Sequence, residues 1–262
     1  MSELYRHPEE YDFEHLGDEE DVRFYLALSQ RFAPRKILEL GCGTGRITLP
    51  LAQIGFDVVG LDTQTEMLGK AEERRLIASF ETRQRLQLVE GDMRTWSARS
   101  DFDLILIPAS SITHVLSLED QIAVWKTCRE NLRPGGRLVV EVTMPNMASF
   151  ADSFSVPPRT LVEIDIDNVD ESDGMRLIRR KTTRYLSHEQ RAQIRFMYEK
   201  YQDGRGVESF LDDFESHVFF PRELRLLFIH TGYEVEETIG DYRGRPLKAD
   251  SSVMIMIGRR SN

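Results

Sequence analysis

Hydrophobic residues follow two alternating spacings over the first half of the chain. Short apolar runs predict buried strands at 37–40, 56–61, 86–89, 102–107 and 137–142. The stretches between several of these runs have apolar residues three or four positions apart, which is typical of helices and predicts them at 46–54, 63–77 and 118–132. Because strand, helix and strand in this order form right-handed crossovers, the pattern predicts a parallel sheet with helices on both faces.

The pattern changes between Pro157 and Phe220, where apolar and polar residues alternate and turn-forming segments intervene. The alternation predicts strands at 159–166, 175–186, 191–201 and 214–219. We expect an antiparallel sheet inserted after the fifth strand, and not a separate domain, because about 60 residues form only a marginal core. The first pattern resumes with a helix from Pro221 and two strands, at 233–239 and 252–257.

The first strand runs into a glycine-rich turn, K-I-L-E-L-G-C-G-T-G, with glycines at 41, 43 and 45. A strand, a glycine turn and a helix N-terminus form a pocket of the kind that binds nucleotides, because the backbone is bare and the free N–H groups face the ligand. The dinucleotide fingerprint G-x-G-x-x-G would place its last glycine at position 46, where this chain has Arg46. This difference argues against a nicotinamide cofactor.

Two acidic residues refine the expected ligand. Glu39 lies two residues before the first glycine and would repel a pyrophosphate, whereas it suits a cationic adenosyl amino acid. Asp62 ends the second strand, 17 residues past Gly45, where a carboxylate can accept both hydroxyl protons of a ribose. Asp62 could instead cap the following helix, and one carboxylate can do both.

These motifs together resemble a known family. The pattern E-x-G-x-G-x-G from Glu39, the acid Asp62, Gly91-Asp92 and the turn 134–136 (Pro-Gly-Gly) resemble the class I S-adenosylmethionine-dependent methyltransferases. The resemblance covers most of 18–145 and 220–260. It implies S-adenosylmethionine as cofactor and a Rossmann-like α/β fold, whose seven-stranded sheet is mostly parallel with an antiparallel last strand.

The layout is also similar to small-molecule enzymes of the sugar N,N-dimethyltransferase and glycine N-methyltransferase-like type. The similarity rests on the tyrosine-containing N-terminal segment, the β insert and the sequence G-D-Y-R-G-R-P-L before the last strand. We expect one methyltransferase domain over 1–262. Its parts are an N-terminal lid segment and helix (1–34), the cofactor-binding core (35–148), an antiparallel β insert for substrate, lid or dimer contacts (150–220), and a closing helix and hairpin (221–262).

The resemblance also assigns roles to individual residues. It implies that the Asp92 side chain binds the adenine amino group and that the Met93 backbone meets a ring nitrogen. The full set expected at the cofactor is Tyr11, Glu39, Gly41, Cys42, Gly43, Arg46, Asp62, Thr63, Met67, Asp92, Met93 and Pro108.

His114 is the candidate general base, because it follows the fourth strand at the carboxyl end of the sheet. It could instead only position the substrate, or simply belong to a loop that enters a helix. The residues expected at the substrate are Tyr185, Arg195, Tyr198, His217, Tyr242 and Arg243.

Composition and charge exclude several classes of binding partner. The chain has 34 basic and 44 acidic residues and a net charge of −10, which argues against a nucleic-acid substrate. We expect no membrane partner and no signal peptide, because no apolar run approaches about 20 residues and the N-terminus is polar and acidic. Two cysteines predict neither a metal site nor a disulfide framework, and they fit a cytoplasmic protein. The acidic surface and the insert permit a homodimer.

The sequence therefore predicts an enzyme that methylates an N or O atom of a small molecule. An amine acceptor needs only to arrive neutral, whereas a hydroxyl acceptor benefits from a general base. The alternatives are a non-catalytic cofactor-sensing protein of the same fold, a nicotinamide-dependent oxidoreductase, and a protein methyltransferase. The last would need an open groove.

Overall fold

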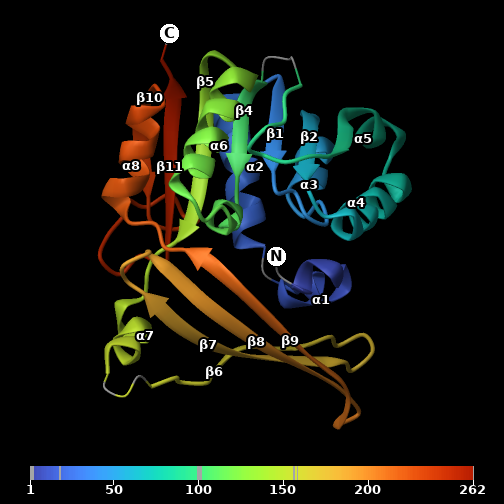
Figure 1. The fold of residues 1–262 in the computed structure, drawn as a ribbon. Helices are drawn as coiled ribbons and strands as arrows, with labels where there is room; N and C mark the ends of the chain where they lie inside the picture. The colour runs from blue at the N-terminus through green and yellow to red at the C-terminus, as the bar shows by residue number, and fades with distance from the viewer. Residues whose placement is uncertain (1–2, 18, 99–101, 156, 158, 262) are drawn as a thin grey trace. The chain divides into compact units, whose positions relative to one another are not determined.

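A computed structural model describes residues 3–17, 19–98, 102–155, 157 and 159–261 (Figure 1). These residues form two compact units. The first unit consists of Met1–Asp18 and Pro145–Val218, and the second of Glu19–Met144 and Phe219–Asn262. The prediction of a single domain over 1–262 stays a prediction.

The second unit contains a seven-stranded sheet with the order β10-β11-β5-β4-β1-β2-β3 (Figure 1). Its strands are β1 (Lys36–Leu40), β2 (Asp57–Asp62), β3 (Leu86–Glu90), β4 (Phe102–Ile107), β5 (Leu132–Thr143), β10 (Tyr233–Ile239) and β11 (Val253–Arg260). The five neighbouring strands β5, β4, β1, β2 and β3 pair in parallel. Strand β11 is antiparallel to both β5 and β10. The predicted sheet, with its antiparallel last strand, is confirmed.

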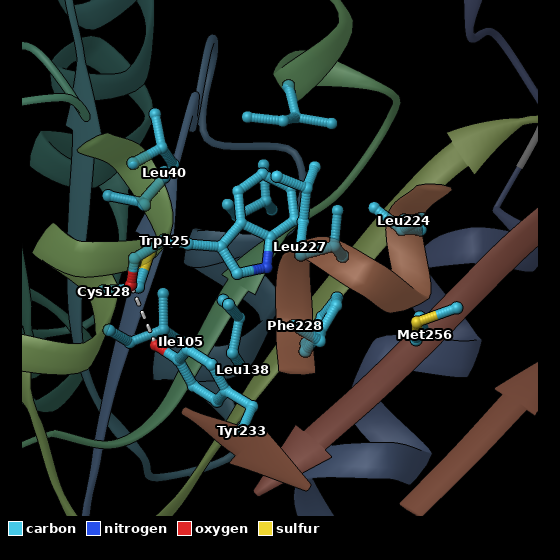
Figure 2. Close-up of a cluster of buried hydrophobic side chains, with 14 of the residues drawn as sticks. Leu40, Ile105, Trp125, Cys128, Leu138, Leu224, Leu227, Phe228, Tyr233 and Met256 are labelled. Atoms are coloured by element: carbon cyan, nitrogen blue, oxygen red, sulfur yellow. Dashed lines mark hydrogen bonds between the residues drawn. The ribbon is translucent and has the colours of Figure 1, made fainter. Parts of the chain in front are cut away.

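Helices cover both faces of this sheet. They are α2 (Glu20–Phe32), α3 (Thr48–Gln53), α4 (Thr65–Ile77), α5 (Phe80–Arg85), the 3₁₀ helix η2 (Ser111–His114), α6 (Leu118–Asn131) and α8 (Pro221–His230). On one face Trp125 of α6 and Phe228 of α8 pack against strand residues such as Leu138 (Figure 2). On the other face Tyr25 and Leu28 of α2 pack against the opposite side of the same strands.

Several predicted boundaries are wrong for local reasons. The helix after the glycine turn begins at Thr48 and not at position 46, because the turn continues to Ile47. Helix α4 begins at Thr65 and not at position 63, because Asp62 accepts a hydrogen bond from the backbone N–H of Gln64. The segment 134–136 belongs to β5, which shifts register against β4 there. Helix α5 was not predicted.

The first unit contains the antiparallel sheet that the sequence predicts, with strand order β6-β7-β8-β9. Its strands are β6 (Glu163–Val169), β7 (Arg176–Leu186), β8 (Arg191–Gln202) and β9 (Arg205–His217). The first strand starts later than predicted, and the last is longer. The unit also contains η1 (Glu3–Arg6), α1 (Pro8–Glu14), α7 (Met147–Ala151) and η3 (Asp152–Phe154).

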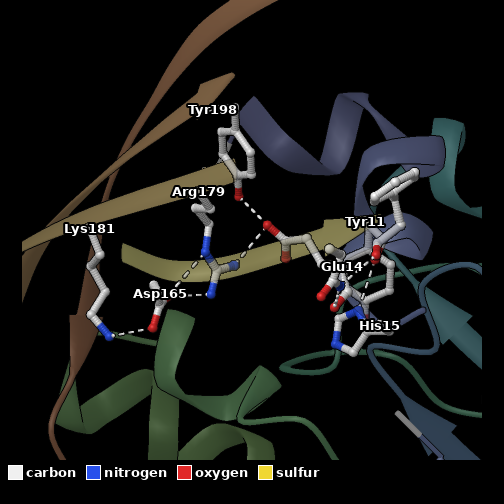
Figure 3. A network of polar contacts seen from close by, with 9 residues as sticks. Tyr11, Glu14, His15, Asp165, Arg179, Lys181 and Tyr198 are labelled. Carbon is white, nitrogen blue, oxygen red and sulfur yellow. Dashed lines mark hydrogen bonds and ion pairs between the residues drawn. The ribbon is translucent and has the colours of Figure 1, made fainter. Parts of the chain in front are cut away.

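Helix α1 is held on this sheet by a buried ionic network (Figure 3). The carboxylate of Glu14, which is 4% exposed, accepts a hydrogen bond from the Tyr198 hydroxyl at 2.5 Å and pairs with Arg179 at 2.7 Å. Arg179 also pairs with Asp165 at 2.5 Å. The side-chain amide of Asn168 donates to the backbone oxygens of residues 13 and 14, each at 3.1 Å. The N-terminal segment therefore completes the unit formed by the insert.

The close packing of Gly258 in β11 against helix α8 gives a test of how tightly the core is packed. A Cβ atom at Gly258 of β11 would lie 2.3 Å from the Phe228 ring, whereas one at Gly69 of α4 would meet nothing within 4 Å. We expect Gly258→Ala to lower the free energy of unfolding by about 1–3 kcal/mol because the ring must shift. Gly69→Ala is the matched control and should raise it by about 0.5–1 kcal/mol, because alanine favours helix. Urea unfolding checks both, and equal effects would contradict the packing.

Candidate active site

The glycine turn follows β1 at the carboxyl edge of the seven-stranded sheet. The backbone N–H groups of Gly41 and Cys42 donate to the Leu61 carbonyl oxygen at 2.8 and 3.0 Å, so the turn folds back onto β2. Gly41 has φ +73°, and a Cβ atom there would lie 2.7 Å from the Ser111 hydroxyl oxygen. Only glycine therefore fits at this position, and the backbone of the turn lies directly against the start of η2.

Asp62 connects the turn to the end of β2. One carboxylate oxygen accepts from the Gly43 N–H at 2.8 Å, and the other accepts from the Gln64 N–H at 2.9 Å. Burial raises the pKa of Asp62, and these backbone hydrogen bonds oppose the rise. The two oxygens have about four lone pairs for the backbone N–H groups of residues 43, 63 and 64, so the carboxylate can still accept a ligand hydroxyl.

Glu39 is a buried carboxylate beside the turn, 2% exposed. Its Oε2 atom has no hydrogen-bond partner among the described residues. Burial raises the pKa of Glu39 well above its usual range, the nearby Arg46 guanidinium opposes this, and Asp62 adds to it. Arg46 itself donates to Asp21 of α2 at 3.1 Å. A buried carboxylate oxygen without a donor costs stability, which is typical of a group that binds a ligand.

The exits of β3 and β4 approach the same turn. The Met93 methyl carbon would lie 3.8 Å from a Cβ atom at Gly41, so this side chain faces the turn. Asp92 pairs with Arg94 at 2.5 Å, and the guanidinium lowers the pKa of Asp92. An adenine amino group at Asp92 would share this carboxylate with Arg94.

His114 ends η2, one 3₁₀ turn after Ser111. Side chains three residues apart in a 3₁₀ helix eclipse one another, so we expect His114 on the same side of η2 as Ser111. Helix η2 is tied to the β4 exit by the Ser111 hydroxyl, which donates to the Pro108 carbonyl oxygen at 2.9 Å. Helix η2 thus begins beside the glycine turn and ends at His114, whose catalytic role stays a prediction.

Other residues predicted to bind the cofactor differ in exposure. The side chains of Cys42 and Met67 are 4% and 1% exposed, so they offer almost no surface to a ligand in this conformation. Pro108 is buried, and Thr63 is exposed. Tyr11 lies in the first unit, where its ring contacts His15. Their predicted roles in binding stay predictions.

The predicted substrate residues fall in both units. In the second unit, the Tyr242 hydroxyl donates to Glu141 at 2.7 Å, and the exposed Arg243 approaches Glu20 at 3.6 Å. Four others lie on strands of the first unit: Tyr185 is buried and stacks on Phe150, Arg195 is exposed and pairs with Asp213, Tyr198 donates to Glu14, and His217 is buried. No substrate role is tested by these contacts.

Sequence reasoning missed Ser111, Asp21 and Glu141. Ser111 and Asp21 give no signal in sequence, because they lie in a polar loop and in the acidic first turn of α2. Glu141 does give a signal, because it is a charged residue inside the apolar run of β5. It accepts hydrogen bonds from the Tyr25 and Tyr242 hydroxyls, each at 2.7 Å.

Among the described residues, no group of three or more His, Cys, Asp or Glu could hold a metal ion. No helix in the same ranges is long and apolar enough to span a membrane.

Comparison with known proteins identifies the region that carries this site. Residues 37–136 match the model of a methyltransferase domain, and they include the glycine turn, Asp62 and the β4 exit. They contain β2, β3 and β4 and most of β1, which are neighbours in the sheet described above. Residues 37–136 are therefore similar in sequence to a methyltransferase domain.

Two curated methyltransferases match most of the chain. The cypemycin N-terminal methyltransferase of Streptomyces sp is 26% identical over 86% of this chain and 83% of its own length. The dTDP-3-amino-3,4,6-trideoxy-alpha-D-glucopyranose N,N-dimethyltransferase of Streptomyces venezuelae is 27% identical over 92% and 95%. The methyltransferase fold is also shared with the SAM-bound structure of CalS10, an amino pentose methyltransferase from Micromonospora echinaspora, at 21% identity and a TM-score of 0.72 over 96% of each chain.

The raised pKa of Glu39 predicts that the free energy of unfolding of this protein depends on pH. The folded state binds the Glu39 proton more tightly than the unfolded chain, so this group lowers the free energy of unfolding as pH rises above about 4.3. We expect Glu39→Gln to be more stable than the parent at about pH 8, with a gain that shrinks toward about pH 4. Urea unfolding across this range measures the gain. The exposed Glu130→Gln is the control, and a gain that is independent of pH would contradict the prediction.

Proposed function

We propose that this chain is an S-adenosylmethionine-dependent methyltransferase that methylates an amino nitrogen of a small molecule. The proposal rests on the buried Glu39 carboxylate, whose Oε2 atom lacks a hydrogen-bond partner among the described residues. This carboxylate lies beside the glycine turn, which Asp62 connects to β2. A carboxylate there suits a cationic ligand and would repel a phosphate.

The residues present fit this cofactor. The Asp62 carboxylate can still accept a ribose hydroxyl, the bare backbone at Gly41 allows close approach, and the Met93 side chain faces the turn. Glu39 and Arg46 would meet the methionine end, where the ligand has an ammonium and a carboxylate. Bound S-adenosylmethionine supplies an activated methyl group, so the protein chiefly has to hold the acceptor in line with it. Such positioning removes up to about 7–11 kcal/mol from a barrier.

An amino nitrogen is favoured as acceptor by the names of the two relatives that match most of the chain. One acts on an N-terminus and the other forms an N,N-dimethylamine. A neutral amine attacks without prior loss of a proton, so His114 needs only to orient the amine or take its proton after transfer. We also propose a cytoplasmic location, which fits the buried free thiols Cys42 and Cys128.

Calorimetry with S-adenosylhomocysteine, with NAD as the control ligand, tests the proposed cofactor. We expect binding of the homocysteine adduct alone. The pure protein is then incubated with S-adenosylmethionine and amino sugars or peptides with free N-termini, and methylated product is measured by mass spectrometry. Binding without transfer to any amine or hydroxyl acceptor would favour the cofactor-sensing alternative, and preference for NAD would overturn the proposal.

Removing one charged acceptor from Asp62 should weaken this binding. We expect Asp62→Asn to lower the affinity for S-adenosylhomocysteine about 10- to 100-fold, because the amide group has only one accepting oxygen. Asp57→Asn is the control at the exposed start of β2, where Asp57 pairs with Arg85 at 2.9 Å. Equal affinities of the two variants would contradict the role of Asp62.

His114→Ala separates catalysis from binding. We expect methyl transfer to an amine to fall by about 10²-fold or more if His114 takes or orients the proton, with unchanged affinity for S-adenosylhomocysteine. The exposed His188→Ala, in the β7–β8 turn, is the control. Full turnover by His114→Ala would remove the residue from the mechanism.

A further inference from the structure

Glu141 is a buried carboxylate that the proposed mechanism does not use. It lies on β5 and is 2% exposed. Its Oε1 atom accepts from the Tyr242 hydroxyl and its Oε2 atom accepts from the Tyr25 hydroxyl, each at 2.7 Å. The backbone N–H of Ala109 is a third donor to the same carboxylate. Glu141 thus joins β5 to helix α2, to the loop between β10 and β11, and to the exit of β4.

The segment that Glu141 holds at the β4 exit is strained. Ala109 has φ +49° and the next residue, Ser110, has φ +59°, so two consecutive residues other than glycine adopt the left-handed conformation. Each such residue costs about 1–3 kcal/mol and persists only where its surroundings hold it. Ser110 is held through its hydroxyl, which accepts from the Thr143 N–H at 2.9 Å. Ala109 has no polar side chain, so its contact with Glu141 is made through the backbone N–H.

The strained turn leads directly into η2. Its next residue, Ser111, is the residue whose hydroxyl approaches the glycine turn, and His114 follows one 3₁₀ turn later. A change in the left-handed pair would therefore move the start of η2 relative to Gly41. The turn therefore sets how closely Ser111, at the start of η2, lies to the backbone of Gly41.

We propose that Glu141 is a positioning residue, which holds the Ala109–Ser110 turn in its left-handed conformation and so places η2, from Ser111 to His114, beside the glycine turn. That His114 meets the acceptor rests on the proposed function, whereas the hold on the turn does not. A leucine or valine would fill the same space, as neighbouring β5 residues do, without the cost of burying a carboxylate. The carboxylate instead accepts hydrogen bonds from three separate elements, which a leucine or valine could not do.

Hydrogen exchange and side-chain NMR test this proposal without a known acceptor. Glu141→Ala removes the acceptor of the Ala109 N–H, and we expect that amide to exchange at least about tenfold faster. We also expect the His114 imidazole resonances to shift in histidine-labelled protein. Glu141→Gln keeps an oxygen in place and should restore part of the amide protection. A folded Glu141→Ala protein with the exchange and resonances of the parent would overturn the proposal.

If Glu141→Ala does not fold, variants that remove a single hydrogen bond test the role of Glu141. Tyr25→Phe and Tyr242→Phe each remove one hydrogen bond to Glu141, and both should shift the His114 resonances. The matched control is Tyr233→Phe, because the Tyr233 hydroxyl is also buried and donates to the Trp125 carbonyl oxygen at 3.1 Å, on the opposite face of the sheet (Figure 2). The control should leave His114 unchanged. Unshifted resonances in both Glu141-contacting variants, or an equal shift in the control, would overturn the proposal.

Affinity for S-adenosylhomocysteine distinguishes this proposal from the proposed function. We expect every variant to bind it within about threefold of the parent, since none of the changed residues is among those assigned to the cofactor. Failure of the parent to bind would overturn the proposed function, while the exchange of the Ala109 amide would still decide the role of Glu141. A loss of affinity in Glu141→Gln as large as in Asp62→Asn would instead place Glu141 at the cofactor and overturn a positioning role.

Discussion

The close approach of η2 to the glycine turn is the constraint on which the site depends. The backbone at Gly41 and the Ser111 side chain are so near that a single added methyl group would overlap them. This contact requires a glycine on one side and a fixed turn on the other. The strained residues after β4 and the buried carboxylate that holds one of them follow from that requirement.

Buried acids recur on the face of the sheet that α2 covers. Glu39 and Glu141 lie on strands either side of β4, and both have a raised pKa because burial disfavours their charge. Their surroundings differ, because Glu141 is satisfied by three donors whereas one oxygen of Glu39 has none among the described residues. A buried glutamate therefore stabilises the fold at position 141 and is suited to binding a ligand at position 39. Stability lost at such positions is typical of functional sites.

The parts of the fold that depend on short-range sequence patterns could be predicted from the sequence. The run from Phe102 to Ile107 is buried at every position, and its strand could be predicted from hydrophobicity alone. The glycine turn and Asp62 were recognised because their chemistry depends on spacing. In contrast, the partners of Glu141 lie 101 and 116 residues away, and the segment after β4 reads as an ordinary polar loop. Contacts of that range are set by the folded sheet and cannot be inferred from one stretch of chain.

The pairing of α1 with the inserted sheet has a consequence for the order in which the chain acquires structure. Glu14 and its partner Tyr198 are 184 residues apart, so during synthesis the first helix leaves the ribosome long before the strand that binds it. A helix of seven residues has little stability alone. Helix α1 therefore gains the contacts that stabilise it only after most of the chain has been made.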